Sequence, residues 1–188
     1  MTMNRLTASL IAFLSVAGLG GLIAYWPSPV PMPLEPPAPR DRPVDGKATL
    51  SPNQAHALDK RRAEVKARFE QGIVMLHARR YEYALAAFHR VLELAPETPE
   101  AHVNLGYTLL GMKRYKEALA FFESATVLRP WQANAYYGMA EAMDALGERS
   151  GAIGAMRTFE HLAQKDDPFV VKARAALTRW QKDNKPAR

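Results

Sequence analysis

The chain has 188 residues, a formal net charge of +6 and no cysteine. This length allows one compact domain with appendages and excludes a large multidomain enzyme. Hydrophobic residues make up 48% and charged residues 23% of the chain, which excludes a fully disordered protein. The absence of cysteine excludes disulfides, thiolate zinc sites, cysteine nucleophiles and covalent haem attachment.

The excess positive charge lies entirely after Gly46, because the basic and acidic residues before it balance. A basic surface can bind nucleic acid, an anionic membrane or an acidic partner. A solvated helix surface explains such a charge more simply. We therefore do not expect nucleic acid as a partner.

Residues 6–26 form a run without any charged side chain, after a short N-terminal tail of residues 1–5. As a helix rising about 1.5 Å per residue, this run is about 31 Å long, which matches the hydrocarbon core of a bilayer. A cleaved secretory signal ending near Ala17 is the alternative. However, the apolar run continues to Tyr25 and Trp26, which suit a membrane interface. We predict one uncleaved transmembrane signal-anchor helix.

Positive charges near this span favour one orientation. Arg5 directly precedes it, whereas the next basic residue after it is Arg40. The positive-inside rule then exports everything after Trp26. We predict a single-pass protein, most simply of a bacterial inner membrane, with its folded domain on the periplasmic side. Small residues spaced by four in the span would let two such helices approach closely, so a homo-oligomer is an alternative.

Residues 27–50 are a predicted proline-rich linker. Its first part, residues 27–43, holds eight of the fourteen prolines of the chain. Proline fixes φ and lacks a backbone donor, so this part should be extended and about 50 Å long at about 3.1 Å per residue. We interpret it as a spacer; a docking ligand for an SH3-like domain is the alternative.

From Ser51 onward the chain is rich in Ala, Leu, Arg and Glu at a spacing typical of helices. Ser51, Pro52 and Gln54 are typical of a helix start, and we predict a long helix from there to about Arg79. Residues 51–64 are its N-terminal extension. The basic residues that follow His56 predict a solvated helix face.

The most informative feature is a 34-residue repeat, which marks helix pairs that bury their apolar faces only by stacking. Small residues recur at Gly72, Gly106 and Ala140, where they allow a second helix to approach closely. A weaker third copy continues through Ala152 and Met156. The identities at this offset are Tyr81 with Tyr115, Ala84 with Ala118, Leu85 with Leu119, Phe88 with Phe122, Leu94 with Leu128, and Pro96 with Pro130.

This pattern of small, aromatic and proline residues resembles the tetratricopeptide repeat (TPR) family. The resemblance implies an all-α, right-handed solenoid of about three helix pairs, with units at 65–98, 99–132 and 133–166. The third unit departs from the pattern at Arg149 and Gln164, and Gly151 and Gly154 weaken its second helix. Residues 167–188 should form a capping helix and a basic tail. Its predicted apolar stripe is Phe169, Ala173, Leu177 and Trp180, with Lys172, Arg174, Arg179 and Lys182 facing water.

Catalytic motifs are absent from the sequence. The five histidines show no metal-ligand spacing, and the chain has neither a phosphate-binding loop nor a Gly-x-Ser-x-Gly turn. We therefore expect no enzyme activity, no cofactor and no metal.

The TPR resemblance implies that a protein or peptide partner binds in a groove lined by the first helix of each unit. Asn104 and Asn134 could hydrogen-bond an extended backbone. Tyr107 and Tyr137 suit a groove because a phenol tolerates both apolar contacts and water; Ile73 and Val103 could instead be packing residues. The predicted groove residues are Lys66, Phe69, Glu70, Ile73, Glu100, Val103, Asn104, Tyr107, Asn134, Tyr137, Gly138 and Glu141.

Relatives that grip a chaperone's C-terminal carboxylate use several Lys, Arg and Asn side chains together. Only Asn104 fits that set here, since Phe69, Ile73, Asn134 and Gly138 hold the other positions. We therefore do not expect this kind of grip. The sequence predicts a membrane-tethered adaptor. The alternatives are an envelope assembly factor similar to TPR modules of cytochrome maturation, and a self-associating scaffold.

Overall fold

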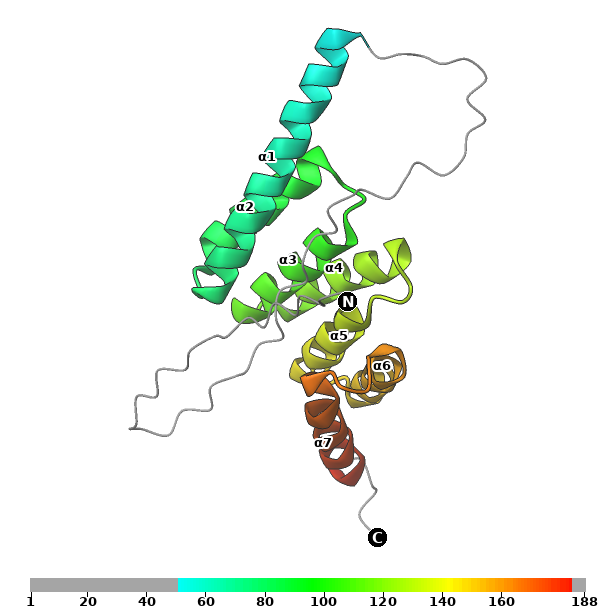
Figure 1. Ribbon diagram of the computed structural model, residues 1–188. Helices are drawn as coiled ribbons and strands as arrows, with labels where there is room; N and C mark the ends of the chain where they lie inside the picture. The colour runs from blue at the N-terminus through cyan, green and yellow to red at the C-terminus, as the bar shows by residue number, and fades with distance from the viewer. Residues whose placement is uncertain (1–50, 184–188) are drawn as a thin grey trace, which may run out of the picture.

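The computed structural model describes residues 51–183, which form seven helices and no strand (Figure 1). The predicted membrane span and proline-rich linker lie outside these residues. No helix between residues 51 and 183 has the length and apolarity that crossing a bilayer requires. The helices are α1 (Pro52–His77), α2 (Tyr81–Leu94), α3 (Pro99–Gly111), α4 (Tyr115–Leu128), α5 (Ala133–Ala145), α6 (Arg149–Leu162) and α7 (Pro168–Asp183).

Helix α1 begins with the predicted cap. The Gln54 backbone N–H donates to the Ser51 hydroxyl over 3.3 Å, and the Ser51 N–H donates back to Gln54 Oε1 over 2.9 Å. This reciprocal pair satisfies two donors that a helix start otherwise leaves without partners. The helix ends at His77, two residues earlier than predicted, because Arg79 takes a positive φ of 56°.

The turn inside each helix pair repeats with the same period. Arg79, Lys113 and Gly147 have φ values of 56°, 61° and 81°. In each turn the next residue's N–H donates to a carbonyl five residues back, at 2.8 to 2.9 Å. This left-handed ending satisfies helix carbonyls, and glycine adopts it without strain. Only the third unit has glycine at this position.

The pairs α1–α2, α3–α4 and α5–α6 stack in chain order, and α7 packs against α6 (Figure 1). Phe122 of α4 is fully buried between two units. A Cβ added at Gly106 would lie 2.6 Å from its ring, and one added at Gly138 of the next unit would lie 2.2 Å away. The predicted need for small residues at close helix approaches is thus confirmed for Gly106, and Gly138 meets the same ring.

The third unit and α7 form the C-terminal core. Helix α6 is continuous despite its two glycines, and Ala152, Met156 and Phe159 on it are buried. The predicted stripe of α7 is confirmed: Ala173, Leu177 and Trp180 are buried in this cluster, and Phe169 packs against it partly buried. Helix α7 therefore closes the end of the core.

Candidate functional site

The first helices of successive units lie next to one another. Helix α3 contacts both α1 and α5, and an aromatic contact links α5 to α7. Pro168, the first residue of α7, follows Asn134 by one repeat period, so α7 takes the place of the first helix of a fourth unit. We call the side of α1, α3 and α5 that carries the predicted groove residues, together with the side of α7 at the same repeat positions, the first-helix face.

The α1 part of this face is open. Lys66 and Glu70 form a weak ion pair of 4.0 Å, with side chains 59% and 64% exposed. Phe69 instead points into the core, where its ring meets Phe88 edge to face at 5.7 Å. Ile73 is partly buried against the same core. Lys66 and Glu70 are therefore the predicted groove residues of α1 that a ligand reaches most easily.

The α3 part of the face is buried. Val103, Asn104 and Tyr107 are all 0% exposed. The Tyr107 hydroxyl donates to the Asn134 carbonyl over 2.7 Å, and its ring meets Phe122 edge to face at 5.0 Å. Burial raises the pKa of this phenol well above its usual value. Tyr107 thus ties α3 to α5, and its side chain is not exposed to a ligand.

Glu100 forms an ion pair that the sequence analysis did not anticipate. Its carboxylate, only 3% exposed, pairs with Arg129 at the end of α4, and the same guanidinium donates to Gln132 Oε1 over 3.1 Å. Because Arg129 and Gln132 precede α5, the ion pair of Glu100 with Arg129 holds α3 to the turn before α5. The repeat pattern gave no signal for this pair, because Arg129 is not part of the matching positions.

On α5, Tyr137 is 6% exposed and lies between two aromatic rings. Its ring meets Phe159 at 5.0 Å and Phe169 of α7 at 5.4 Å, both edge to face. Burial raises the pKa of Tyr137 above its usual value. Gly138 faces the Phe122 ring. The aromatic contacts place Tyr137 at the junction of α5 and α7.

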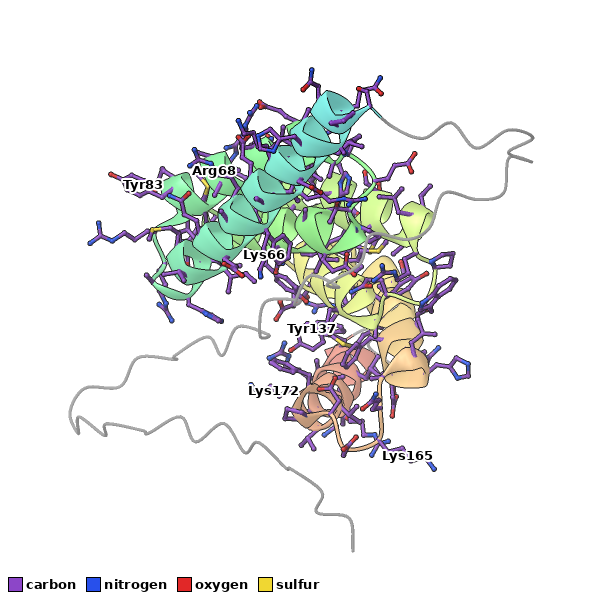
Figure 2. The ribbon with its side chains drawn as sticks, turned by 45° about the horizontal axis from the view of Figure 1, so that its top comes forward. Lys66, Arg68, Tyr83, Tyr137, Lys165 and Lys172 are labelled. Atoms are coloured by element: carbon purple, nitrogen blue, oxygen red, sulfur yellow. The ribbon has the colours of Figure 1, made fainter. Side chains whose placement is uncertain are left out.

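Two charged residues lie beside this junction. Burial raises the pKa of Glu141 to about 7; nearby Lys172 opposes the shift and Asp144 adds to it. The Lys172 ammonium lies 4.8 Å from the centre of the Phe169 ring (Figure 2). The prediction that Lys172 simply faces water is therefore wrong. Lys172 follows Gly138 by one repeat period, so the repeat continued into α7 would have placed it on the first-helix face.

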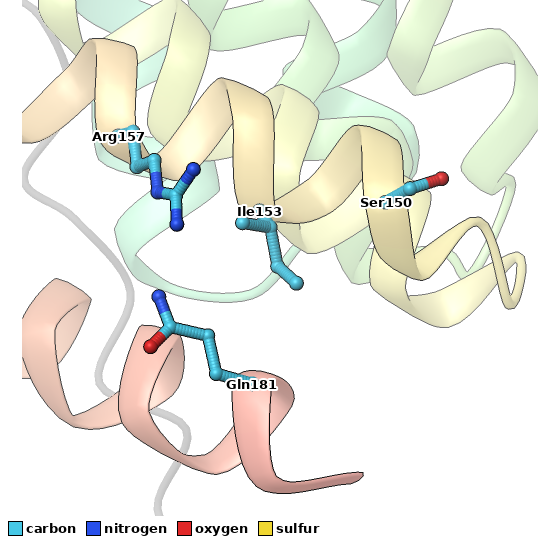
Figure 3. Close-up of a pocket in the computed structure, with 4 residues that line it drawn as sticks. All are labelled: Ser150, Ile153, Arg157 and Gln181. Carbon is cyan, nitrogen blue, oxygen red and sulfur yellow. The ribbon is translucent and has the colours of Figure 1, made fainter. Parts of the chain in front are cut away.

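A shallow hollow lies elsewhere, at the seam of α6 and α7. Ser150, Ile153, Arg157 and Gln181 line it, and the Arg157 and Gln181 side chains face one another across the seam (Figure 3). These side chains include no nucleophile with a neighbouring base. Across residues 51–183, no three His, Asp or Glu side chains gather as metal ligands would.

The family comparison matches a tetratricopeptide repeat model to residues 75–126 and 109–177, together more than half of the chain. The chain belongs to the tetratricopeptide repeat family. This confirms the resemblance drawn from the repeat period. No curated protein matches the sequence.

Solved TPR structures share the fold at low sequence identity. The TPR2B domain of yeast Sti1 in complex with an Hsp70 peptide is 16% identical, with a TM-score of 0.61 over 65% of this chain and 99% of that one. The translocator chaperone SycD of Yersinia enterocolitica is 16% identical, with a TM-score of 0.62 over 66% and 96%. The second TPR domain of human RPAP3 with an HSP70 peptide is 17% identical, with a TM-score of 0.58 over 64% and 98%.

Proposed function

We propose that this protein is a membrane-tethered adaptor that binds an extended segment of a partner protein along its first-helix face. The observation that carries the proposal is the continuity of this face across four helices, from Lys66 on α1 to Lys172 on α7 (Figure 2). A face of this kind offers aromatic rings and charged side chains to one extended chain. Several structures with this fold contain a bound peptide, which supports the same use here.

The proposed partner segment differs from a terminal carboxylate ligand. Phe69 lies in the core and Gly138 faces Phe122, so neither offers a donor to a carboxylate. The cations of the face are instead Lys66 and Lys172, which lie on its outermost helices. We therefore propose that the face binds an internal stretch of a partner, held by ion pairs at both ends.

Photo-crosslinking in the native cell tests this function. A photoreactive residue in place of Asn134, which is partly exposed on α5, should capture one discrete partner. The same residue in place of Tyr83, 62% exposed on α2, is the control (Figure 2). Adding Lys172→Ala should weaken the capture at position 134. Equal adducts from both positions would contradict the proposal, and adducts only between copies of the chain would favour a self-associating scaffold.

The tether and its orientation are part of the proposal and rest on residues 6–26 and Arg5. We propose a single-pass protein of a bacterial inner membrane with the TPR domain on the periplasmic side. The full-length protein should then stay with membranes during a carbonate wash. An alkaline phosphatase reporter fused after Arg188 should be active. Release by carbonate would refute the anchor, and an inactive reporter on a stable fusion would refute the orientation.

A further inference from the structure

Glu141 of α5 is a shielded carboxylate without a bonding partner. Its carboxylate makes no hydrogen bond and no ion pair with any residue in the described part of the chain. Every other described carboxylate that is at least partly buried has a partner. These pairs are Glu64 with Arg90, Glu100 with Arg129, Asp144 with Arg149, Glu160 with Arg174, and Asp167 with the Phe169 N–H.

The electrostatic neighbours of Glu141 place it on the first-helix face, between α3 and α7. In addition to burial, its charge raises the pKa of Tyr107 on α3 and of Tyr137 on α5. Lys172 of α7 lowers the pKa of Glu141 against the effect of burial. Unlike Tyr107, Glu141 is partly exposed, and its oxygens keep contact with solvent. A ligand on this face can therefore reach the carboxylate.

The charges at this junction leave one negative charge unbalanced. Asp144, one turn further along α5, already has its own cation. The other carboxylate is Asp167, which caps α7 by accepting the Phe169 N–H over 2.8 Å. Among the described residues, Lys172 is the one cation that acts on Glu141, and its ammonium lies 4.8 Å from the centre of the Phe169 ring. Glu141 and Asp167 thus share a single cation.

We propose that Glu141 receives the guanidinium of an arginine in the bound partner segment, and so determines which segment binds. The inference rests on the proposed function of the first-helix face and adds the chemistry of one partner side chain. The carboxylate offers two oxygens without partners, which match the planar fork of a guanidinium and its two parallel hydrogen bonds. A guanidinium is also more weakly hydrated than an ammonium, so it enters a partly buried site at a lower cost.

The cost of Glu141 to the fold supports a role in binding. Burial raises the pKa of Glu141 to about 7, because the shielded site disfavours the charged form. A glutamine would have a similar shape without this cost. Active and binding sites are the places where a protein keeps such destabilising groups. An arriving guanidinium supplies the missing cation and lowers this pKa, so binding should release a proton near neutral pH.

Peptide pools test the inference with the full chain in lipid nanodiscs. Each pool contains short peptides whose central residue is fixed as arginine, lysine, citrulline or leucine, while all other positions vary. Citrulline has the shape of arginine without its charge. Mass spectrometry measures how much of each pool the immobilised nanodiscs retain. Glu123→Gln is the matched control for Glu141→Gln, because Glu123 is an exposed glutamate on the second helix α4.

At about pH 8 the arginine pool should be retained at least about tenfold better than the citrulline pool, and better than the lysine pool. Lowering the pH to about 6 should reduce this preference by up to about tenfold, because most Glu141 carboxylates are then protonated. Glu141→Gln should abolish the preference, whereas Glu123→Gln should keep it. Glu141→Gln should also raise the melting temperature at about pH 8, because it removes an uncompensated charge.

Three results would overturn the inference. They are equal retention of the arginine and citrulline pools, equal retention of the arginine and lysine pools, and a preference for arginine that survives Glu141→Gln. A lower melting temperature of Glu141→Gln would also overturn it, because the residue would then serve the fold. Retention of every pool without preference would leave the adaptor function standing, whereas retention of no pool would refute both.

Discussion

Gly138→Ala tests whether Phe122 joins two repeat units through direct contact. A Cβ at position 138 would lie 2.2 Å from the Phe122 ring, so the ring or the helix must move by about 1 Å to restore an ordinary contact. The ring is 0% exposed, meets Tyr107 at 5.0 Å and packs on Gly106, so it has no free direction. Overpacking of this kind costs about 1–3 kcal/mol.

Helix propensity acts in the opposite direction and provides the control. Alanine stabilises a helix interior by up to about 1 kcal/mol relative to glycine. Gly138→Ala should therefore lower the free energy of unfolding by up to about 2 kcal/mol. Gly154→Ala on α6 meets no atom within 4 Å, so it should raise that free energy by about 0.5–1 kcal/mol.

Urea unfolding of the full chain in detergent, followed by circular dichroism in the far ultraviolet, measures both changes. Phe122→Leu adds a coupling test, because a smaller side chain makes room for the new Cβ. In that background, Gly138→Ala should cost much less than it does alone. Equal stabilisation by Gly138→Ala and Gly154→Ala would refute the reasoning, as would the absence of any coupling to position 122.

Three further changes test other contacts. Lys113→Gly should stabilise the domain by about 1 kcal/mol and Gly147→Ala should destabilise it similarly, because both residues have positive φ; two shifts of the same sign in thermal melts would contradict this. Arg129→Met leaves the buried Glu100 carboxylate without its cation and should cost about 3 kcal/mol in urea unfolding, a loss that adding Glu100→Gln should reduce. The raised pKa of Glu141 means that the folded state holds its proton more tightly. Stability should therefore fall as pH rises from about 4.5 to about 7, and Glu141→Gln should remove this part of the pH dependence in thermal melts.

The helix pairs could be predicted from the sequence because their determinants are local and periodic. The identities between repeats set the positions of Tyr81, Phe88 and Phe122, and a small residue is needed wherever a ring from another helix arrives. The capping signals at Ser51 placed the start of α1 within one residue. Neither prediction required knowledge of any contact between distant positions.

Side-chain pairs between units could not be predicted in this way. Glu100 meets Arg129 because the turn before α5 folds back onto α3, and no repeat position encodes that geometry. The same holds for the bond from Tyr107 to the Asn134 carbonyl. Lys172 is different, since the repeat period extends to it. Its side chain was predicted to face water because α7 was interpreted only as a capping helix.

Helix α7 has two faces, and this explains why it both ends the core and extends the first-helix face. Leu177 and Trp180 are buried against the third unit, as a cap requires. Phe169 contacts Tyr137 of α5, and Lys172 lies over the Phe169 ring, as expected of the first helix of a further unit. A change confined to Lys172 should thus weaken binding with only a small loss of stability, whereas Trp180→Ala should cause a large loss of stability. The two variants separate the contribution of α7 to the core from its contribution to the first-helix face.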